Sequence, residues 1–407
     1  MTTPRSPGLP FIFVTLLIDL IGFGVVIPVG PQLVTQLTGN PLLAAHNLGF
    51  LIAMFSLAQL LTAPVLGTLS DRLGRRPVLL ASTLLTAASY GLAALAPSLA
   101  WLFLARALGG IGGATIGVAN AYIADVSTPQ TRARNFGLAG AAFGLGLIVG
   151  PALGGLLGQY GLRLPYGVAA ALALLNFVYG LVVLPESRPR NQAPVALSSF
   201  VPLRALSVLG HFPGLPVLAA VITCMNLAQQ FLTSTWVLHG TLRYGWTTGT
   251  NGVSLAVAGV VSAFVQVALL PRVLARLGTE RTVTLGIVLG VLGYVAYGLS
   301  SSAWMVYATM PIGALAGIAA PALQALIAGR TPPEAQGAVQ GALSGVGSLC
   351  AIAGPLLSTA LFSSFAASDA PMHLPGVAFF AGAVCFVAGL VIFLASRSGP
   401  APQGETA

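Results

Sequence analysis

The chain consists of apolar stretches of about 20 residues, separated only by short breaks that are polar or rich in Gly and Pro. A bilayer core of about 30 Å is crossed by roughly 20 apolar residues in a helix. We therefore predict an all-α membrane protein with twelve transmembrane helices. Their expected starts lie near Leu9, His46, Pro77, Leu99, Arg134, Pro165, Pro213, Gly249, Thr282, Ala303, Ala335 and His373.

Composition agrees with a chain whose main solvent is lipid. Of the 407 residues, 56% are hydrophobic and 6% are charged, against about 25% charged in an ordinary soluble domain. The first apolar segment runs through Asp19 to about Val34. It is too long for the core of a cleaved signal peptide, so we predict that it forms helix 1.

Cys224, Cys350 and Cys385 lie inside apolar stretches, where free Cys behaves as a small hydrophobe, and no disulfide framework is expected.

All 17 basic residues are arginine, and their distribution predicts the orientation. Arginine accumulates in loops that stay in the cytoplasm. Of the loop arginines only Arg163 and Arg243 fall on the opposite side, so both termini are predicted to be cytoplasmic. The same rule explains the net charge of +9 without a nucleic-acid partner. Arginine at every basic position, with abundant Ala, Gly, Leu and Pro, favours a GC-rich bacterial genome and thus a multi-pass protein of the bacterial cytoplasmic (inner) membrane.

Several short motifs recur at an offset of about half the chain. The pairs are Arg72-Leu73-Gly74 with Arg276-Leu277-Gly278, Thr128-Pro129 with Thr331-Pro332, and Gly150-Pro151 with Gly354-Pro355. We predict an N-terminal six-helix bundle at 1–185, a cytoplasmic linker at 186–212 and a C-terminal six-helix bundle at 213–407. Parallel repeats of this kind place a cavity at their interface near the bilayer midplane and expose it alternately to each side.

Asp19 lies about ten residues into helix 1, which puts it about 15 Å deep, near the bilayer centre. A carboxylate there costs about 2.5 to 3.5 kcal/mol on insertion scales, so burial favours the neutral form. Arg106 is the basic residue that lies deep in an apolar segment, and Asp19 is the best-placed acid to partner it. Our hypothesis is that Asp19 carries the coupled proton and Arg106 tunes its charge. A fixed ion pair that only aligns helices is the alternative.

The loop at 67–77, called the gate loop below, joins predicted helices 2 and 3. Glycines suit its tight turn, and its arginines anchor it to the cytoplasmic face. Asp71 can cap a helix or pair with an arginine, whereas the second copy has Ala275 there. This asymmetry favours a gate latch over a merely solvated charge. The gate residues are Gly67, Asp71, Arg72, Gly74, Arg75 and Arg76.

Predicted helix 5 carries Gly146, Gly150, Gly154 and Gly158, spaced by four, with Pro151 and Gly155 beside them. This spacing places the four glycines on one stripe that another helix can approach closely. Pro151 adds a kink. The stripe fits ordinary helix packing, but its echo at Gly354-Pro355 favours an interface between the two halves.

Uncharged polar residues are scattered where the cavity is expected. They suit an uncharged or amphipathic ligand, with Phe23 and Trp236 as aromatic walls. Any single amide is as well explained by contacts between helices. The candidate substrate-binding residues are Gln59, Asn120, Asn226, Gln229, Gln230, Gln266, Gln324 and Gln340.

The gate loop, Arg106 with Gly109 to Gly113, and Gly146 to Gly155 resemble the signature motifs of the major facilitator superfamily. The helix 5 motif is typical of its drug/proton antiporters. Within that superfamily the chain resembles the tetracycline/proton antiporter group over its whole length. The matching segments are Ile18-Asp19, Ser70 to Leu80, Ile123-Ala124-Asp125, Phe143 to Pro151, Tyr244-Gly245-Trp246, Pro321-Ala322-Leu323-Gln324 and Gln336-Gly337-Ala338.

The resemblance implies export of a drug-like molecule against proton entry. It also implies that Asp71 and Arg75 form a cytoplasmic gate, that Asp125 shares a charge network with that loop, and that Gln59 and Gln266 lie near the substrate path. Members that export metal-chelated tetracycline typically carry acids in helices 3 and 9, and some have a His in helix 8. The matching positions here hold Ser89, Leu289 and Ser262, so another amphipathic drug or a metabolite stays open as substrate.

Other functions were weighed against proton-coupled export. A uniporter or proton symporter differs only in coupling. A membrane-embedded enzyme or assembly factor is disfavoured because the four histidines are not clustered and no nucleophile motif occurs. We therefore expect a transporter and not an enzyme, without cofactor or metal, driven by the proton gradient. Its expected partners are a small molecule, protons and the lipid bilayer, and a monomer is expected.

Overall fold

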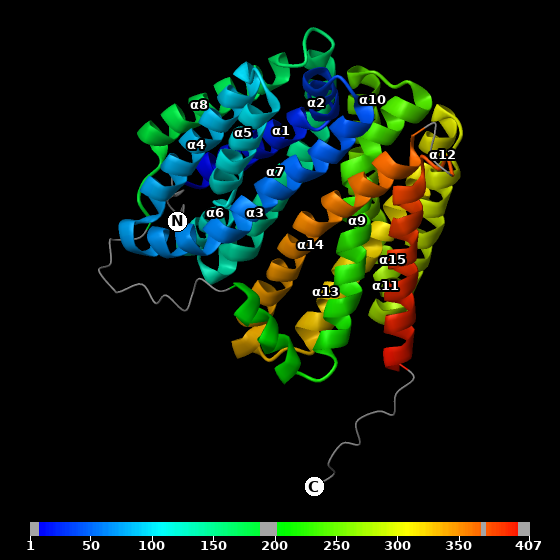
Figure 1. Cartoon of the computed structure of the whole chain (residues 1–407). Coiled ribbons are helices and arrows are strands. Elements are labelled where there is room, and N and C mark those ends of the chain that lie inside the picture. Colours follow the sequence, from blue (N-terminus) through cyan, green and yellow to red (C-terminus); the bar gives the residue numbers. More distant parts are fainter. Residues whose placement is uncertain (1–7, 188–201, 368–371, 398–407) are drawn as a thin grey trace. The chain divides into compact units, whose positions relative to one another are not determined.

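A computed structural model describes residues 8–187, 202–367 and 372–397, and every regular element in these ranges is a helix (Figure 1). The chain divides into two compact units. The first comprises 1–201 together with Trp236–Val260, and the second comprises Pro202–Thr235 together with 261–407. The predicted linker lies partly outside the described residues, at 188–201.

The first unit contains the helices of the N-terminal part of the chain, the end of α9 and most of α10. Its helices are α1 (Gly8–Val26), α2 (Gly30–Thr38), α3 (Pro41–Leu73), α4 (Arg75–Leu95), α5 (Leu99–Gly113), α6 (Ile116–Asp125), α7 (Pro129–Gly158), α8 (Leu164–Val183) and α10 (Thr248–Phe264). α9 (Leu215–Tyr244) begins in the second unit.

The second unit contains the remaining helices. They are the 3-10 helix Pro202–His211, the π-helix Val265–Leu269, α11 (Leu270–Leu299), α12 (Ala303–Leu315), the 3-10 turn Ala316–Ile318, α13 (Ala319–Gly329), the 3-10 turn Pro333–Ala335, α14 (Gln336–Phe365) and α15 (Val377–Arg397). In both units the helices are long and apolar, as the hydrophobic pattern predicts.

Within the described ranges, ten helical runs are long and apolar enough to cross a membrane, and the bent pair α1–α2 adds an eleventh. One of the ten, Thr248–Leu299, has 52 residues. At 1.5 Å per residue it is about 78 Å long, more than twice a bilayer core. It bends at Gly278, where φ is 73°. This run therefore contains two of the predicted crossings, and the all-α membrane fold is confirmed.

Helix 1 differs from the prediction because it does not continue to Val34. α1 ends at Val26, and α2 begins at Gly30 with an angle of 44° between them. Pro28 lies in the break, and a proline ring clashes with the carbonyl four residues earlier. The chain tightens there, and the N–H of Ile27 donates to the carbonyl of Gly24 at 3.2 Å. Proline chemistry thus interrupts an apolar run that hydropathy reads as continuous.

The repeat seen in the sequence is visible in the backbone. Gly74 and Gly278 both have positive φ, 100° and 73°, a region that glycine adopts without a steric penalty. Each stands at the same point of the repeated motif, before the next membrane span. The compact units follow packing, whereas the predicted bundles follow the sequence repeat, so the predicted boundaries at 185/186 and 212/213 remain a prediction.

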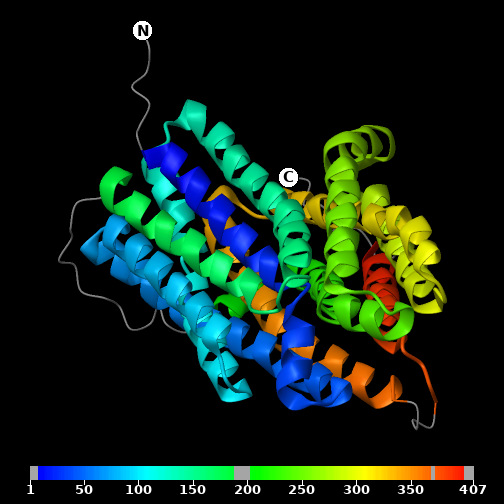
Figure 2. The same ribbon diagram turned by 90° about the horizontal axis from the view of Figure 1, so that it is seen from above.

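The glycine stripe of α7 packs against α1, which runs beside α7 and α8 in Figure 2. A Cβ on Gly150 would lie 2.8 Å from Cα of Gly24 and 2.9 Å from the carbonyl oxygen of Ile21. A Cβ on Gly154 would overlap the carbonyl oxygen of Val25, and one on Gly146 would overlap Cβ of Leu20. The glycines therefore allow the two backbones to touch.

The predicted contact of the stripe with the second half of the sequence is therefore wrong for Gly146, Gly150 and Gly154. It holds for Gly155, where a Cβ would lie 2.8 Å from both Cα of Gly252 and the carbonyl oxygen of Thr248 on α10. Gly158 contacts Thr248 as well, at 3.1 Å from its Cβ. Spacing by four identifies a stripe but not the helix it meets, and Gly155 points to a second neighbour.

We predict that Gly154→Ala destabilises the protein by about 1–3 kcal/mol, because the new methyl group meets fixed backbone of α1. Gly144→Ala is the control on the same helix, since a Cβ there meets nothing within 4 Å. Alanine favours helix over glycine by up to about 1 kcal/mol, so the control should be neutral or stabilising. Thermal unfolding in detergent measures both variants, and equal melting temperatures would contradict the packing described.

Candidate functional site

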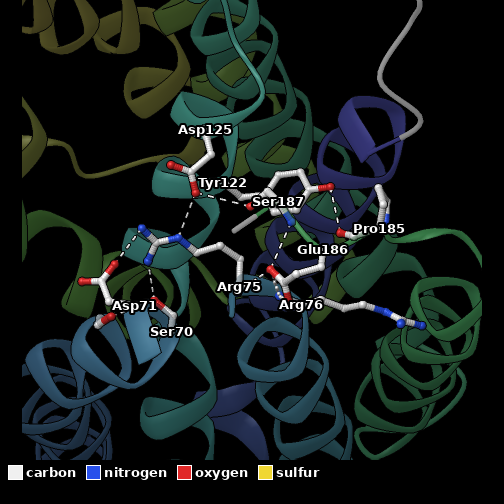
Figure 3. Close-up of polar contacts among 10 residues, drawn as sticks. Ser70, Asp71, Arg75, Arg76, Tyr122, Asp125, Pro185, Glu186 and Ser187 are labelled. Atoms are coloured by element: carbon white, nitrogen blue, oxygen red, sulfur yellow. Dashed lines mark hydrogen bonds and ion pairs between the residues drawn. The ribbon is translucent and has the colours of Figure 1, made fainter. Parts of the chain in front are cut away.

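Arg75 is the centre of a charge network at the junction of α3, α4, α6 and α8 (Figure 3). Its Nε lies 3.1 Å from Oδ2 of Asp125, and its Nη2 lies 2.9 Å from Oδ1 of Asp71. Its Nη1 donates to Oγ of Ser70 at 2.6 Å. The side chain is only 6% exposed. A buried charge is tolerated when it is paired and fully hydrogen-bonded, which this planar fork of donors achieves.

The gate loop is shaped to present this arginine. Ser70 donates in turn to the carbonyl of Gly67 at 2.7 Å, so its hydroxyl is oriented to accept from Arg75. Gly74 turns the chain with φ of 100° between α3 and α4. Asp71 and Arg75 lie one helical turn apart in number but on different helices, and their ion pair spans the turn. The segment predicted as a loop is therefore helical on both sides of Gly74, and it is not a free linker.

Glu186 is a residue that sequence reasoning missed, since it was assigned only to the linker. Its carboxylate accepts from the backbone N–H of Arg75 at 2.8 Å, of Arg76 at 3.2 Å and of Ser187 at 3.0 Å. The first N–H groups of a helix lack partners and attract negative charge, so Glu186 caps α4. A Cβ on Gly74 would overlap this carboxylate. Glycine is therefore required at this position for two reasons, the positive φ and the space that Glu186 occupies.

The end of α8 is tied to α6 by two further bonds. Ser187 donates from Oγ to Oδ2 of Asp125 at 3.3 Å, and Tyr122 donates to the carbonyl of Pro185 at 3.1 Å. Arg76 reaches the carbonyl of Leu181 at 2.7 Å. The sequence did offer one sign of the role of Glu186, because this acid follows closely after the last apolar residue of predicted helix 6. Its partner Arg75, however, lies 111 positions away in the chain, so the contact could not be read from the sequence.

The remaining gate residues have simpler surroundings. Arg72 lies in the last turn of α3 with an exposed side chain. Gly67 has open space where a Cβ would be, so its contribution is the carbonyl that Ser70 uses. The structure thus joins Asp71, Arg75 and Asp125 as the resemblance implies, and adds Glu186.

Asp19 lies in α1 with Oδ1 buried and without a protein hydrogen-bond partner. In the part of the chain that the structure describes, no ion pair joins Asp19 to Arg106. Tyr90 instead lies within electrostatic range of both side chains, and Tyr166 lies close to Arg106. One turn before Asp19, Thr15 donates to Oδ1 of Asn176 on α8 at 3.2 Å. The acid is thus surrounded by neutral groups and is not neutralised by a contacting cation.

The predicted substrate residues of the first unit have different surroundings. Gln59 donates to the carbonyl of Gly113 at 3.0 Å, at the break between α5 and α6. Phe23 is 43% exposed and its ring centroid lies 6.4 Å from that of Phe55. Asn120 is exposed. Trp236 is 7% exposed and its indole N–H donates to Ser254 at 3.0 Å, which gives it a packing role.

In the second unit, Gln340 donates to Oε1 of Gln324 at 3.2 Å, so these two predicted residues meet. Gln266 is exposed and lies in the π-helix, a local form often found at functional sites. Its amide nitrogen lies 3.7 Å from the Cβ position of Gly317, in the 3-10 break between α12 and α13. The two glutamines Gln59 and Gln266 thus face corresponding helix breaks in the two repeats.

The other predicted amides of α9 face α14 or lie exposed. A Cβ on Gly354 would overlap Cβ of Gln230, and one on Gly347 would lie 3.9 Å from the amide nitrogen of Asn226. Gln229 has an exposed side chain. Gln230 is therefore a packing residue first, because its stem fills the space opened by Gly354.

Comparison with known proteins identifies the family. The sequence profile described as Major Facilitator Superfamily matches residues 12–355 and 268–407. The chain belongs to this superfamily. It is 38% identical over 388 residues to the tetracycline resistance protein, class C, of Escherichia coli, covering 95% of both chains. It is also 38% identical to the tetracycline resistance protein, class G, of Vibrio anguillarum, covering 86% of this chain and 88% of the relative.

Solved structures agree on the fold of this superfamily member. A bacterial homolog of the human lysosomal transporter Spinster is 19% identical and superimposes with a TM-score of 0.78, covering 98% of each chain. The human organic anion transporter MFSD10 (TETRAN) is 23% identical with a TM-score of 0.71, covering 96% of this chain and all of that chain. The resemblance drawn from the motifs is confirmed at the level of the superfamily and of the tetracycline resistance relatives.

We predict that Glu186→Gln destabilises the protein by about 1–3 kcal/mol and slows transport. Glutamine offers one acceptor oxygen where three backbone N–H groups now meet a carboxylate, so donors at the start of α4 lose their partner. Glu334→Gln, at an exposed acid, is the control. Melting temperature and initial transport rate are the measurements, and a Glu186→Gln protein indistinguishable from the control would contradict the capping role.

Asp71→Asn tests the gate loop separately. We expect slower turnover with drug binding retained, because Asp71 is 48% exposed and forms its ion pair with Arg75 of the gate loop. Binding to purified protein and turnover in vesicles separate the two effects. Turnover equal to that of wild type would remove Asp71 from the gate.

Proposed function

We propose that this chain is a proton-coupled exporter of a small amphipathic drug-like molecule such as a tetracycline. It would work by alternating access, opening first to one side of the membrane and then to the other. Support for transport as such comes from membership of the superfamily and from the repeated six-helix pattern. Support for drug export comes from the relatives named as tetracycline resistance proteins.

The observation that carries the proton coupling is the buried, unpartnered carboxyl oxygen of Asp19. A charged group inside a membrane segment is costly unless it is paired, and such a group is a functional site by default. Asp19 has no contacting cation among the described residues. Its carboxyl can therefore gain or lose a proton as water reaches it from one side or the other, without breaking an ion pair first.

The network around Arg75 would act as a gate on the cytoplasmic side of the membrane. Arg75 links Asp71 at the end of α3 with Asp125 at the end of α6. Opening to the cytoplasm would require these contacts to loosen, so the network would hold the junction closed until substrate or proton binding favours release. We further place both termini on the cytoplasmic side of a bacterial cytoplasmic membrane, in accordance with the arginine distribution.

The substrate would be recognised mainly by neutral groups. Gln59, Gln266 and the pair Gln324–Gln340 offer amide donors and acceptors, and Phe23 with Phe55 offers an aromatic surface. Such groups suit a planar, amphipathic molecule. Ser89 is buried and donates to the carbonyl of Ala105 at 2.9 Å, so it contributes no charge where metal-drug exporters typically carry an acid. We therefore expect the drug without a required metal ion to be the transported form.

The decisive experiment compares wild type with Asp19→Asn in proteoliposomes that enclose a pH indicator. An imposed proton gradient should drive drug transport in the wild type, and drug should in turn drive proton movement. Asp19→Asn should abolish both, because an amide cannot carry the proton. Glu280→Gln removes a surface acid paired with Arg397 and should behave as wild type. Full coupling in Asp19→Asn would refute the assignment, and gradient-independent transport in the wild type would favour a uniporter.

A further inference from the structure

Tyr90 on α4 lies against α1 one turn beyond Asp19. A Cβ on Gly22 would be 3.0 Å from Cε2 of Tyr90 and 3.2 Å from its hydroxyl oxygen. Asp19 and Gly22 are three residues apart, so they are neighbours on one helix face, about 5–6 Å between their Cβ positions. The glycine thus admits the phenol ring beside α1, next to the face that carries the acid.

A hydrogen bond next to Tyr90 joins α4 to α5, the helix that carries Arg106. Ser89 donates to the carbonyl of Ala105 at 2.9 Å, and a Cβ on Gly109 would lie 2.7 Å from the same hydroxyl. Ser89 and Ala105 directly precede Tyr90 and Arg106 in the chain, so this bond holds α4 and α5 together at their level. Tyr90 is accordingly within electrostatic range of Asp19 on one side and Arg106 on the other.

One buried polar atom here lacks a protein partner among the described residues, and Tyr90 is the neutral donor nearest to it on α4. That atom is Oδ1 of Asp19. We propose that Tyr90 is the positioning residue of the proton site, whose hydroxyl donates a hydrogen bond to Asp19 whenever that carboxyl is ionised. This inference rests on the proposed function, because it assumes that Asp19 carries the coupled proton.

The chemistry requires a neutral donor between the two charges. When Asp19 releases its proton, the O–H bond of the carboxyl breaks and the proton passes to water, while Tyr90 keeps its own proton and donates to the new carboxylate. Hydrogen bonds to an ionised acceptor are shorter and stronger than neutral ones. Arg106 cannot lose its charge, and its field favours the ionised state of Asp19 without forming a locked ion pair.

Other titratable groups on the elements around α1 are placed differently. Tyr166 on α8 is engaged with Arg106, and Tyr122 on α6 bonds to Pro185. On α7, Arg132 and Arg134 lie at least 12 residues before Gly146, which faces Leu20, and so at least about 18 Å along the helix. Tyr179 on α8 stacks on Phe11, about 12 Å before Asp19 along α1.

The test measures the pH dependence of proton-driven drug uptake into everted vesicles for wild type, Tyr90→Phe and Tyr179→Phe. Tyr90→Phe keeps the ring and removes only the hydroxyl. Without its donor the carboxylate is less stable, so Asp19 keeps its proton to higher pH. We expect the pH of half-maximal uptake to rise by about one unit in Tyr90→Phe, with coupling retained. Tyr179→Phe, at a phenol that is 37% exposed and about 12 Å from the level of Asp19, should leave the profile unchanged.

The outcomes separate this inference from the proposed function. An unshifted profile in Tyr90→Phe, measured beside an inactive Asp19→Asn, would overturn the role of Tyr90 and leave the proton site at Asp19. A fully coupled Asp19→Asn would overturn both. Melting temperatures in detergent show whether Tyr90→Phe is folded.

Discussion

The cost of an unpaired charge in hydrocarbon governs this molecule. The buried charge of Arg75 is paired with Asp71 and Asp125 and hydrogen-bonded to Ser70. Asp19 differs from Arg75, since its Oδ1 is buried without a partner. The same energetic rule therefore explains both parts of the site: the network around Arg75 is stable because it is satisfied, and Asp19 is responsive because it is not.

Glycines allow neighbouring helices to approach α1, the helix that carries Asp19, very closely. Gly150 and Gly154 bring α7 onto the backbone of α1, and Gly22 admits the ring of Tyr90 on another side of α1. Helices in lipid are not driven together by the hydrophobic effect, so they associate through close van der Waals packing, which small residues permit. The proposed proton site thus lies where α1, α4 and α5 meet through contacts that leave no room for larger side chains at these glycines. A substitution that pushes α1 away would alter Asp19 without touching it.

Much of this arrangement follows from the sequence, because membrane spans and charged loops obey strong rules. Hydropathy identified the spans, and the offset of about half the chain identified the repeat now visible at Gly74 and Gly278. The functional role of Asp19 stays a prediction. Long-range partners could not be predicted. Glu186 caps a helix 111 positions away, and an aromatic residue such as Tyr90 in an apolar segment carries no signal that distinguishes it from packing.

The errors have equally physical causes. Hydropathy alone does not register that Pro28 ends α1, because proline acts through a lost hydrogen bond and a steric clash. The spacing of Gly146, Gly150 and Gly154 defines a stripe but leaves its neighbour undetermined, and that neighbour is α1. Local chemistry predicts what a residue can do, and tertiary contacts decide whether it does it.

Infrared difference spectroscopy of the purified protein tests the central claim most directly. The account predicts a band of a protonated carboxyl group that disappears as pH rises, changes when drug binds, and is missing in Asp19→Asn. A spectrum in which Asp19 is ionised at every pH, with and without drug, would contradict the account.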